Sequence, residues 1–131
     1  MIVVDAAAVV DYLLARKPAW PWVAERLARA GSCHAPHVVD FEVASALRRL
    51  TLTEELSPAR GTGALADLRE LPVVRYPAAH LLDTIWRLRS NLTAYDAAYV
   101  ALAELLEVPL VTTDERLARS KGHTAEILTP A

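Results

Sequence analysis

Cysteine and glycine are scarce in this chain. Cys33 is the only cysteine among 131 residues, so no intramolecular disulfide can form, which is typical of a protein from a reducing compartment. Only 4 glycines occur and 53 % of the residues are hydrophobic, which excludes a disordered or low-complexity chain. The length predicts one domain over residues 1–131, because two halves would be too small to bury good cores.

Long uncharged hydrophobic runs are also missing. Asp5 follows the short apolar run 2–4 with no basic segment before it, unlike the pattern of a secretory signal peptide. Acidic residues such as Asp11, Asp96 and Glu104 interrupt the longest apolar tracts. No tract approaches the roughly 18 residues that a membrane helix needs. We therefore expect a soluble, cytoplasmic protein that does not bind a membrane.

Positive charge is not in excess, and lysine is rare. The net charge of −2 argues against a protein that coats nucleic acid through bulk electrostatics. Lys17 and Lys121 are the only lysines among 14 basic residues, so arginine supplies the other 12. Arginine can clamp a phosphate with paired donors, where lysine offers a point charge. The composition is therefore compatible with a nucleic-acid enzyme that has an acidic pocket and a local arginine rim.

Strand and helix signals alternate along the chain. Short β-branched or apolar runs predict strands at 2–4, 32–35, 73–74, 110–111 and, as an edge strand, 127–128. Helical spacing of apolar residues predicts helices at 6–14, 20–30, 36–50, 57–71, 78–89, 93–106 and 115–119. This alternation favours an α/β fold in which helices cover both faces of a mostly parallel sheet of four to five strands.

Two acidic residues come directly after predicted strands. Asp5 follows the first strand, Asp114 follows the strand at 110–111, and each precedes a predicted helix. In open α/β sheets the functional crevice lies beyond the carboxyl ends of the strands, so both residues lie where a site is expected. Taken singly, each is explained more simply as a helix cap.

Two further acids belong to predicted helices. Asp96 lies three residues after the predicted cap Thr93, in the most apolar helix of the chain, with no lysine or arginine within helical reach. A buried charge without a partner is very unfavourable there. Glu42 lies near the start of its helix and, taken alone, is explained as a solvated residue that pairs with Arg49. A divalent cation would satisfy several such carboxylates together.

An all-oxygen set of ligands suits Mg²⁺ or Mn²⁺ better than zinc. Such ions lower the pKa of a bound water, orient it against a phosphodiester and stabilise the leaving oxygen. Thr112 and Thr113 stand beside the last acid and are candidates to hydrogen-bond a water or the scissile phosphate. Strand propensity and helix capping explain these two threonines at least as well. The predicted metal-binding and catalytic set is Asp5, Glu42, Asp96 and Asp114.

Several stretches together point to a known family. The chain contains, in this order, IVVDAAAVVDYLL, APHVVDFEVASALRRL, LTAYDAAYVALAELLEVPLVTTDERLAR and the final predicted strand. In this arrangement it resembles a PIN domain over nearly its whole length, and most closely the VapC-type toxins of bacterial and archaeal toxin–antitoxin pairs. The most distinctive part is the segment 93–99 followed by Thr112, Thr113 and Asp114.

The resemblance implies a fold, an activity and partners. It implies a PIN-like α/β/α sandwich and a Mg²⁺- or Mn²⁺-dependent endoribonuclease, with Asp5, Glu42, Asp96 and Asp114 matching the family's metal-binding acids. It also implies a homodimer and a cognate VapB-like antitoxin that covers the site. Candidate contact surfaces for a partner, for which core packing is the competing explanation, lie around Trp20, Trp22 and Leu27 and around Leu65 and Leu68.

One departure and two alternatives accompany this interpretation. Family members often carry Ser or Thr soon after the first Asp, whereas Ala6, Ala7 and Ala8 follow Asp5 here, so a hydroxyl beside that ligand is missing.

A receiver-type phosphoacceptor domain also uses acids and Mg²⁺ at strand ends. It needs two adjacent acids after the first strand and a lysine on the last, and neither is present. A PIN-fold binding partner without catalytic activity stays open.

Overall fold

The five strands form one sheet in the order β3-β2-β1-β4-β5, and every pair of neighbours is parallel. The computed structural model describes residues 1–130. The strands are β1 (Ile2–Val4), β2 (Cys33–Pro36), β3 (Val73–Tyr76), β4 (Leu110–Val111) and β5 (Ile127–Leu128). The predicted α/β fold is confirmed, with five strands, all parallel, and with the last strand at an edge.

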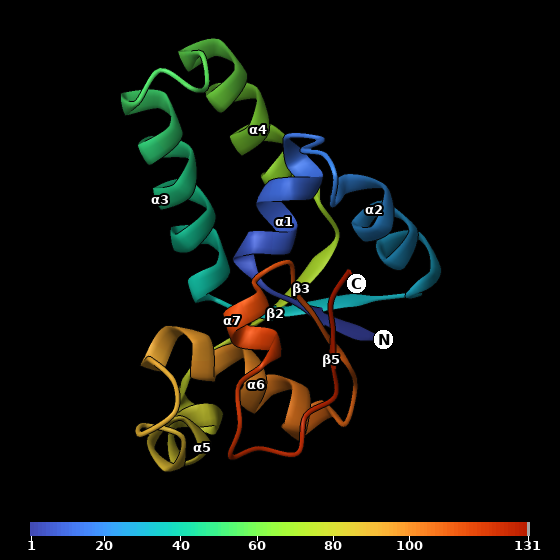
Figure 1. The fold of residues 1–131 in the computed structure, drawn as a ribbon, viewed down its shortest axis with the longest axis vertical. Coiled ribbons are helices and arrows are strands. Elements are labelled where there is room, and N and C mark those ends of the chain that lie inside the picture. Colours follow the sequence, from blue (N-terminus) through green and yellow to red (C-terminus); the bar gives the residue numbers. More distant parts are fainter. Residues whose placement is uncertain (131) are drawn as a thin grey trace.

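Helices cover the sheet on both sides (Figure 1). They are α1 (Ala6–Leu13), α2 (Trp20–Arg29), α3 (Val38–Leu52), α4 (Pro58–Glu70), the 3₁₀ turn η1 (Ala79–Leu81), α5 (Leu82–Arg87), α6 (Ala94–Leu106) and α7 (Glu115–Ala118). In Figure 1, α1 to α4 lie on one side of the sheet and α5 and α6 on the other. Within residues 1–130, we find no helix with the length and apolarity that a membrane crossing requires.

Two predicted helices differ from the observed ones. The helix predicted from residue 36 begins later, because Pro36 ends β2 opposite Tyr76 and the His37 N–H donates to the Tyr76 carbonyl at 2.9 Å. The helix predicted over 78–89 is divided into η1 and the shorter α5. Its buried side chains, Leu81 and Leu88, lie at the two ends of this segment, and no residue of α5 itself is buried.

The core gathers on β1, β4 and α6. Val3, Val4, Leu110 and Val111 are almost fully buried, and so is every residue of α6 from Ala97 to Ala103. Burial on both faces explains why these strands are continuous apolar runs without alternation. The pairing sets Val4 opposite Val111. The residues that leave the carboxyl ends of β1 and β4 therefore emerge side by side.

Candidate functional site

Asp5 and Asp114 occupy the carboxyl ends of the neighbouring strands β1 and β4. Asp5 caps α1, and its Oδ1 accepts from the Ala8 N–H at 2.9 Å. Asp114 caps α7, and its Oδ1 accepts from the Arg116 N–H at 2.9 Å. A carboxylate oxygen has two lone pairs, so a capping bond leaves acceptor capacity on each side chain. Capping and a role in a site are therefore compatible for both acids.

The Thr112 hydroxyl links the two acids from within the protein. It donates to Asp5 Oδ2 and accepts from the Asp114 N–H at 2.9 Å. Thr112 is 0 % exposed, because its side chain faces β1 across the strand pair, so it does not reach a substrate. In this structure the Thr112 hydroxyl thus contacts both acids, which favours a role in positioning them over the expected contact with a water or phosphate. Thr113 is half-buried, and its side chain makes no hydrogen bond to residues 1–130.

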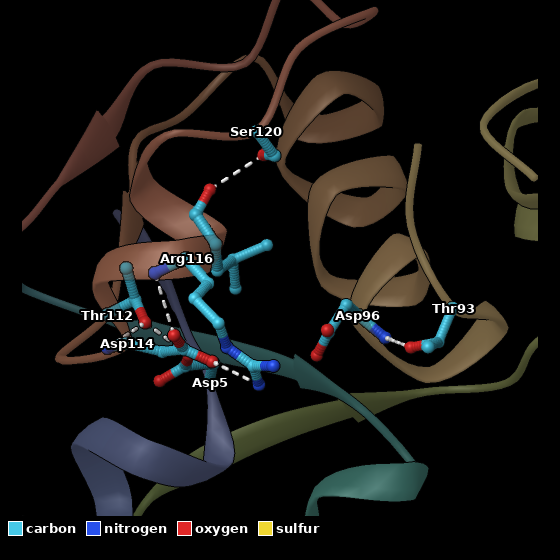
Figure 2. Close-up of polar contacts among 8 residues, drawn as sticks. Asp5, Thr93, Asp96, Thr112, Asp114, Arg116 and Ser120 are labelled. Carbon is cyan, nitrogen blue, oxygen red and sulfur yellow. Dashed lines mark hydrogen bonds and ion pairs between the residues drawn. The ribbon is translucent and has the colours of Figure 1, made fainter. Parts of the chain in front are cut away.

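Asp96 approaches from the opposite side of the site. Thr93 caps α6 by accepting from the Asp96 N–H at 3.2 Å, as predicted, and this places the acid at the half-buried start of a buried helix. Figure 2 shows the Asp96 carboxylate pointing toward Asp5 and Asp114. Asp5, Asp96 and Asp114 are far apart in the sequence, but all three lie at the carboxyl edge of the sheet.

Glu42 joins the site through a tyrosine. Its Oε1 accepts from the Tyr99 hydroxyl at 2.6 Å, across 57 residues of sequence. Tyr99 lies in α6, three residues after Asp96, and is 1 % exposed. We did not predict a role for Tyr99 from the sequence. The available signal was its hydroxyl, which a buried tyrosine must satisfy with a hydrogen-bond partner.

The acids are coupled electrostatically. Burial raises the pKa of Asp5 to about 7, with further upward contributions from the charges of Asp114 and Asp96, although the bonds from Thr112 and Ala8 oppose the shift. Burial and the charge of Asp96 raise the pKa of Glu42. Burial and the charge of Asp114 raise the pKa of Asp96. Carboxylate pKa values raised by burial, and further by the charges of neighbouring acids, are typical of functional sites.

Arg116 is the cation nearest to these acids. Its Nη2 lies 3.7 Å from Asp114 Oδ2, and its charge opposes the upward pKa shift of Asp96. Figure 2 shows the guanidinium extending between Asp114 and Asp96. Its side chain is 85 % exposed, so this ion pair is screened by solvent and contributes little to stability. The sequence placed Arg116 two residues after Asp114 but did not indicate its proximity to Asp96.

The chemistry of this donor set fits a hard divalent cation. The donors are carboxylates from four different elements, and their repulsion would be relieved by a cation that prefers oxygen ligands. In the part of the chain that the structure describes, no three His, Cys, Asp or Glu side chains already stand close enough together to hold an ion. The four carboxylates fit a divalent cation because they are oxygen ligands and carry negative charge, but their arrangement is not yet a complete coordination shell.

The predicted partner surfaces are partly exposed. Trp20, Trp22 and Leu27 are half-buried, and Trp20 and Leu27 line a shallow apolar hollow with Tyr12 and Pro72. On α4, Leu65 is exposed, whereas Leu68 is buried in the core. Core packing therefore explains why Leu68 is apolar. Trp20, Trp22, Leu27 and Leu65 keep surface that a partner can contact.

Comparison with known proteins identifies the relatives of the chain. The PIN domain profile matches residues 2–122. Ribonuclease VapC9 of Mycobacterium tuberculosis (strain ATCC 25618 / H37Rv) is 49 % identical over 118 residues, which cover 90 % of this chain and 89 % of that protein.

Solved structures show the same fold. The structure of Mycobacterium tuberculosis VapC20, described as a Sarcin-Ricin loop cleaving toxin, has a TM-score of 0.73 at 15 % identity and covers 99 % of this chain and 100 % of that one. The structure of VapBC2 from Rickettsia felis, bound to a DNA fragment from their promoter, has a TM-score of 0.64 at 15 % identity, covering 97 % and 98 %.

We predict that Asp5 makes the protein less stable as the pH rises. The folded pKa of Asp5 is about 7, against 3.8 without the fold, so the folded state holds a proton between these values that the unfolded state releases. The contribution of Asp5 is fully present below pH 3.8 and is lost as the pH rises toward 7. In EDTA, urea unfolding should show a loss of about 2 kcal/mol between pH 5 and pH 7.

Asp5→Asn provides the control for this titration, because the amide cannot ionise. The slope of stability against pH should be less negative in the variant than in the wild type. Equal slopes in the two proteins would show that Asp5 has an ordinary pKa.

We also predict that Thr112→Val destabilises the protein by about 1–3 kcal/mol, since it removes the donor to buried Asp5 Oδ2 and the acceptor of the partly buried Asp114 N–H. The same change should raise the pKa of Asp5 further, because the Thr112 hydroxyl lowers it. Urea unfolding measures the first effect and ¹³C carboxyl titration the second. Thr112→Ser keeps the hydroxyl and should leave the pKa of Asp5 unchanged. An unchanged pKa in Thr112→Val as well would contradict the positioning role.

Proposed function

The chain belongs to the PIN-domain family and, within it, to the VapC ribonucleases, and we propose that Asp5, Glu42, Asp96 and Asp114 carry its endoribonuclease activity with the help of a divalent cation. It is the toxin type of a toxin–antitoxin pair, as the VapC relatives indicate. The alternative of a receiver-type phosphoacceptor domain does not apply to a chain of this family.

One observation carries the assignment of the site. Four acids that are far apart in sequence share one edge of the sheet, and three of them have raised pKa values through burial and through one another's charge. Structural salt bridges do not explain them, because the single basic side chain beside them, among the residues described, is the exposed Arg116. Repulsion among these carboxylates destabilises the fold, so their clustering favours a functional role over a structural one.

The residues have separate tasks in the hydrolysis of a phosphodiester. The four carboxylates would hold Mg²⁺ or Mn²⁺, and Thr112 and the capping N–H groups fix Asp5 and Asp114 at their strand ends. When bound, the cation supplies positive charge that lowers the pKa of a water and offsets charge on the phosphate. Hydrolysis would join a water oxygen to phosphorus and break the bond from phosphorus to one ribose oxygen, which would take up a proton, so that the RNA chain is cut.

Contact with RNA is assigned to Arg116 rather than to general surface charge. The protein is slightly acidic, so attraction of RNA by net charge is weak. The Arg116 side chain donates no hydrogen bond to another residue of 1–130, and its guanidinium lies beside Asp114. We propose that it binds a phosphate next to the scissile bond. A cytoplasmic location, where RNA targets occur, stays a prediction.

We propose that the protein forms a homodimer and binds a VapB-like antitoxin that covers the site, and that the apolar hollow near Trp20 and Leu27 is part of a partner-contact surface. Both side chains line this hollow and are only half-buried. Light scattering of the purified chain should give twice the mass of 14.3 kDa, and a co-expressed VapB-like protein should elute with it. A monomer, or no complex with any VapB-like protein tested, would contradict the respective proposal.

Cleavage of RNA tests the function directly. Purified protein, freed of any partner, is incubated with total bacterial RNA in Mg²⁺, Mn²⁺ or EDTA, and new 5′ ends are mapped by sequencing. Asp96→Asn preserves the size of the side chain but removes a ligand charge, and it should lower the rate at least about 100-fold, beyond the loss typical of an outer-shell residue. Asp67→Asn, an exposed acid of α4, is the matched control and should cleave like the wild type.

The outcomes separate enzyme from binding protein. New 5′ ends that require metal and disappear in Asp96→Asn support the proposal. Ends that persist equally in EDTA and in Asp96→Asn would mean a contaminating nuclease. If no ends form while Mn²⁺ still binds, the catalytic assignment fails and a binding partner of the same fold is favoured.

A further inference from the structure

Glu42 differs from the other three acids in how it reaches the site. Asp5, Asp96 and Asp114 sit at helix starts or strand ends. The side chains of Asp5 and Asp114 accept local capping bonds, and the backbone N–H of Asp96 donates to Thr93. Glu42 lies within α3 on a longer side chain with more rotatable bonds. Among residues 1–130, its carboxylate has one hydrogen-bond donor, the Tyr99 hydroxyl at 2.6 Å, and no salt bridge.

Tyr99 is a rigid anchor for that carboxylate. Its side chain is packed in the core at 1 % exposure, and α6 is buried along most of its length. The same helix carries Asp96 three residues earlier, on a neighbouring part of its surface. One helix thus presents an acid of the site and the hydroxyl that orients another.

We infer that Tyr99 is a positioning residue that holds Glu42 in place for the divalent cation. This inference rests on the proposed function, since it takes Glu42 as a ligand. Tyr99 itself touches neither metal nor RNA, because its ring is buried. The competing explanation is that Tyr99 serves packing alone and that Glu42 merely satisfies its hydroxyl.

Mn²⁺ binding to the full chain, measured by isothermal titration calorimetry, distinguishes these explanations. Tyr99→Phe keeps the ring and removes only the hydroxyl, and it should weaken Mn²⁺ binding about 10–100-fold, as for loss of a partner that orients a metal ligand. Tyr76→Phe is the matched control, since the Tyr76 hydroxyl bonds His34 Nδ1 at 2.7 Å and no acid. It should bind Mn²⁺ like the wild type.

A double variant tests the connection to Glu42. In the Glu42→Gln background, Tyr99→Phe should cause no further loss of Mn²⁺ affinity, because the ligand that it positions is already gone. RNA cleavage by Tyr99→Phe should show a lower kcat with little change in KM. A packing role alone would lower the stability of Tyr99→Phe in urea and would leave Mn²⁺ affinity and kcat unchanged.

Three results would overturn the role of Tyr99 or distinguish its failure from failure of the proposed metal site. Wild-type Mn²⁺ affinity in folded Tyr99→Phe overturns the role of Tyr99 and leaves the proposed function intact. No Mn²⁺ binding by the wild type overturns the metal site, and this inference with it. If Tyr99→Phe does not fold, Glu42→Asp keeps the charge but shortens the reach to the phenol, and an unchanged Mn²⁺ affinity there overturns the inference.

Discussion

Repulsion among carboxylates held at one sheet edge is the constraint around which this structure is arranged. Asp5 is nearly inaccessible to solvent, and the charges of Asp114 and Asp96 act on it across the site. The fold tolerates this through local helix caps on two acids and through the buried Thr112 hydroxyl, which reaches Asp5 across 107 residues of sequence. Such contacts reduce the repulsion without removing it, which leaves a site that favours a cation.

The hydroxyls that support the acids come from distant parts of the chain. Ala6, Ala7 and Ala8 follow Asp5, so the start of α1 offers no side-chain hydroxyl to this acid. Thr112 reaches Asp5 from beyond β4, and Tyr99 reaches Glu42 from α6. The carboxylates therefore receive hydroxyl donors through tertiary contacts, in addition to the local N–H groups that cap Asp5 and Asp114.

Local patterns predicted most of the fold and the location of three acids. The β-branched runs indicated strands, and the positions of Asp5 and Asp114 after such runs placed them at one edge, because parallel strands end together. The 3₁₀ turn at 79–81 was missed, because apolar periodicity does not distinguish it from a longer α-helix. The contacts of Thr112 and Tyr99 span 107 and 57 residues, and no local pattern reports how side chains meet over such distances.

The charge of the site also limits how RNA is recognised. A phosphate that approaches this edge faces the charge of the four acids, and the exposed Arg116 alone does not offset it, since a screened surface pair contributes no more than about 1 kcal/mol. The net charge of −2 adds no general attraction for a polyanion. For the RNA contact proposed above, affinity would come from positioned arginines such as Arg116 and from the shape of the RNA, because the acids proposed for the chemistry oppose binding on their own. This balance favours selectivity for particular RNA targets over indiscriminate cleavage.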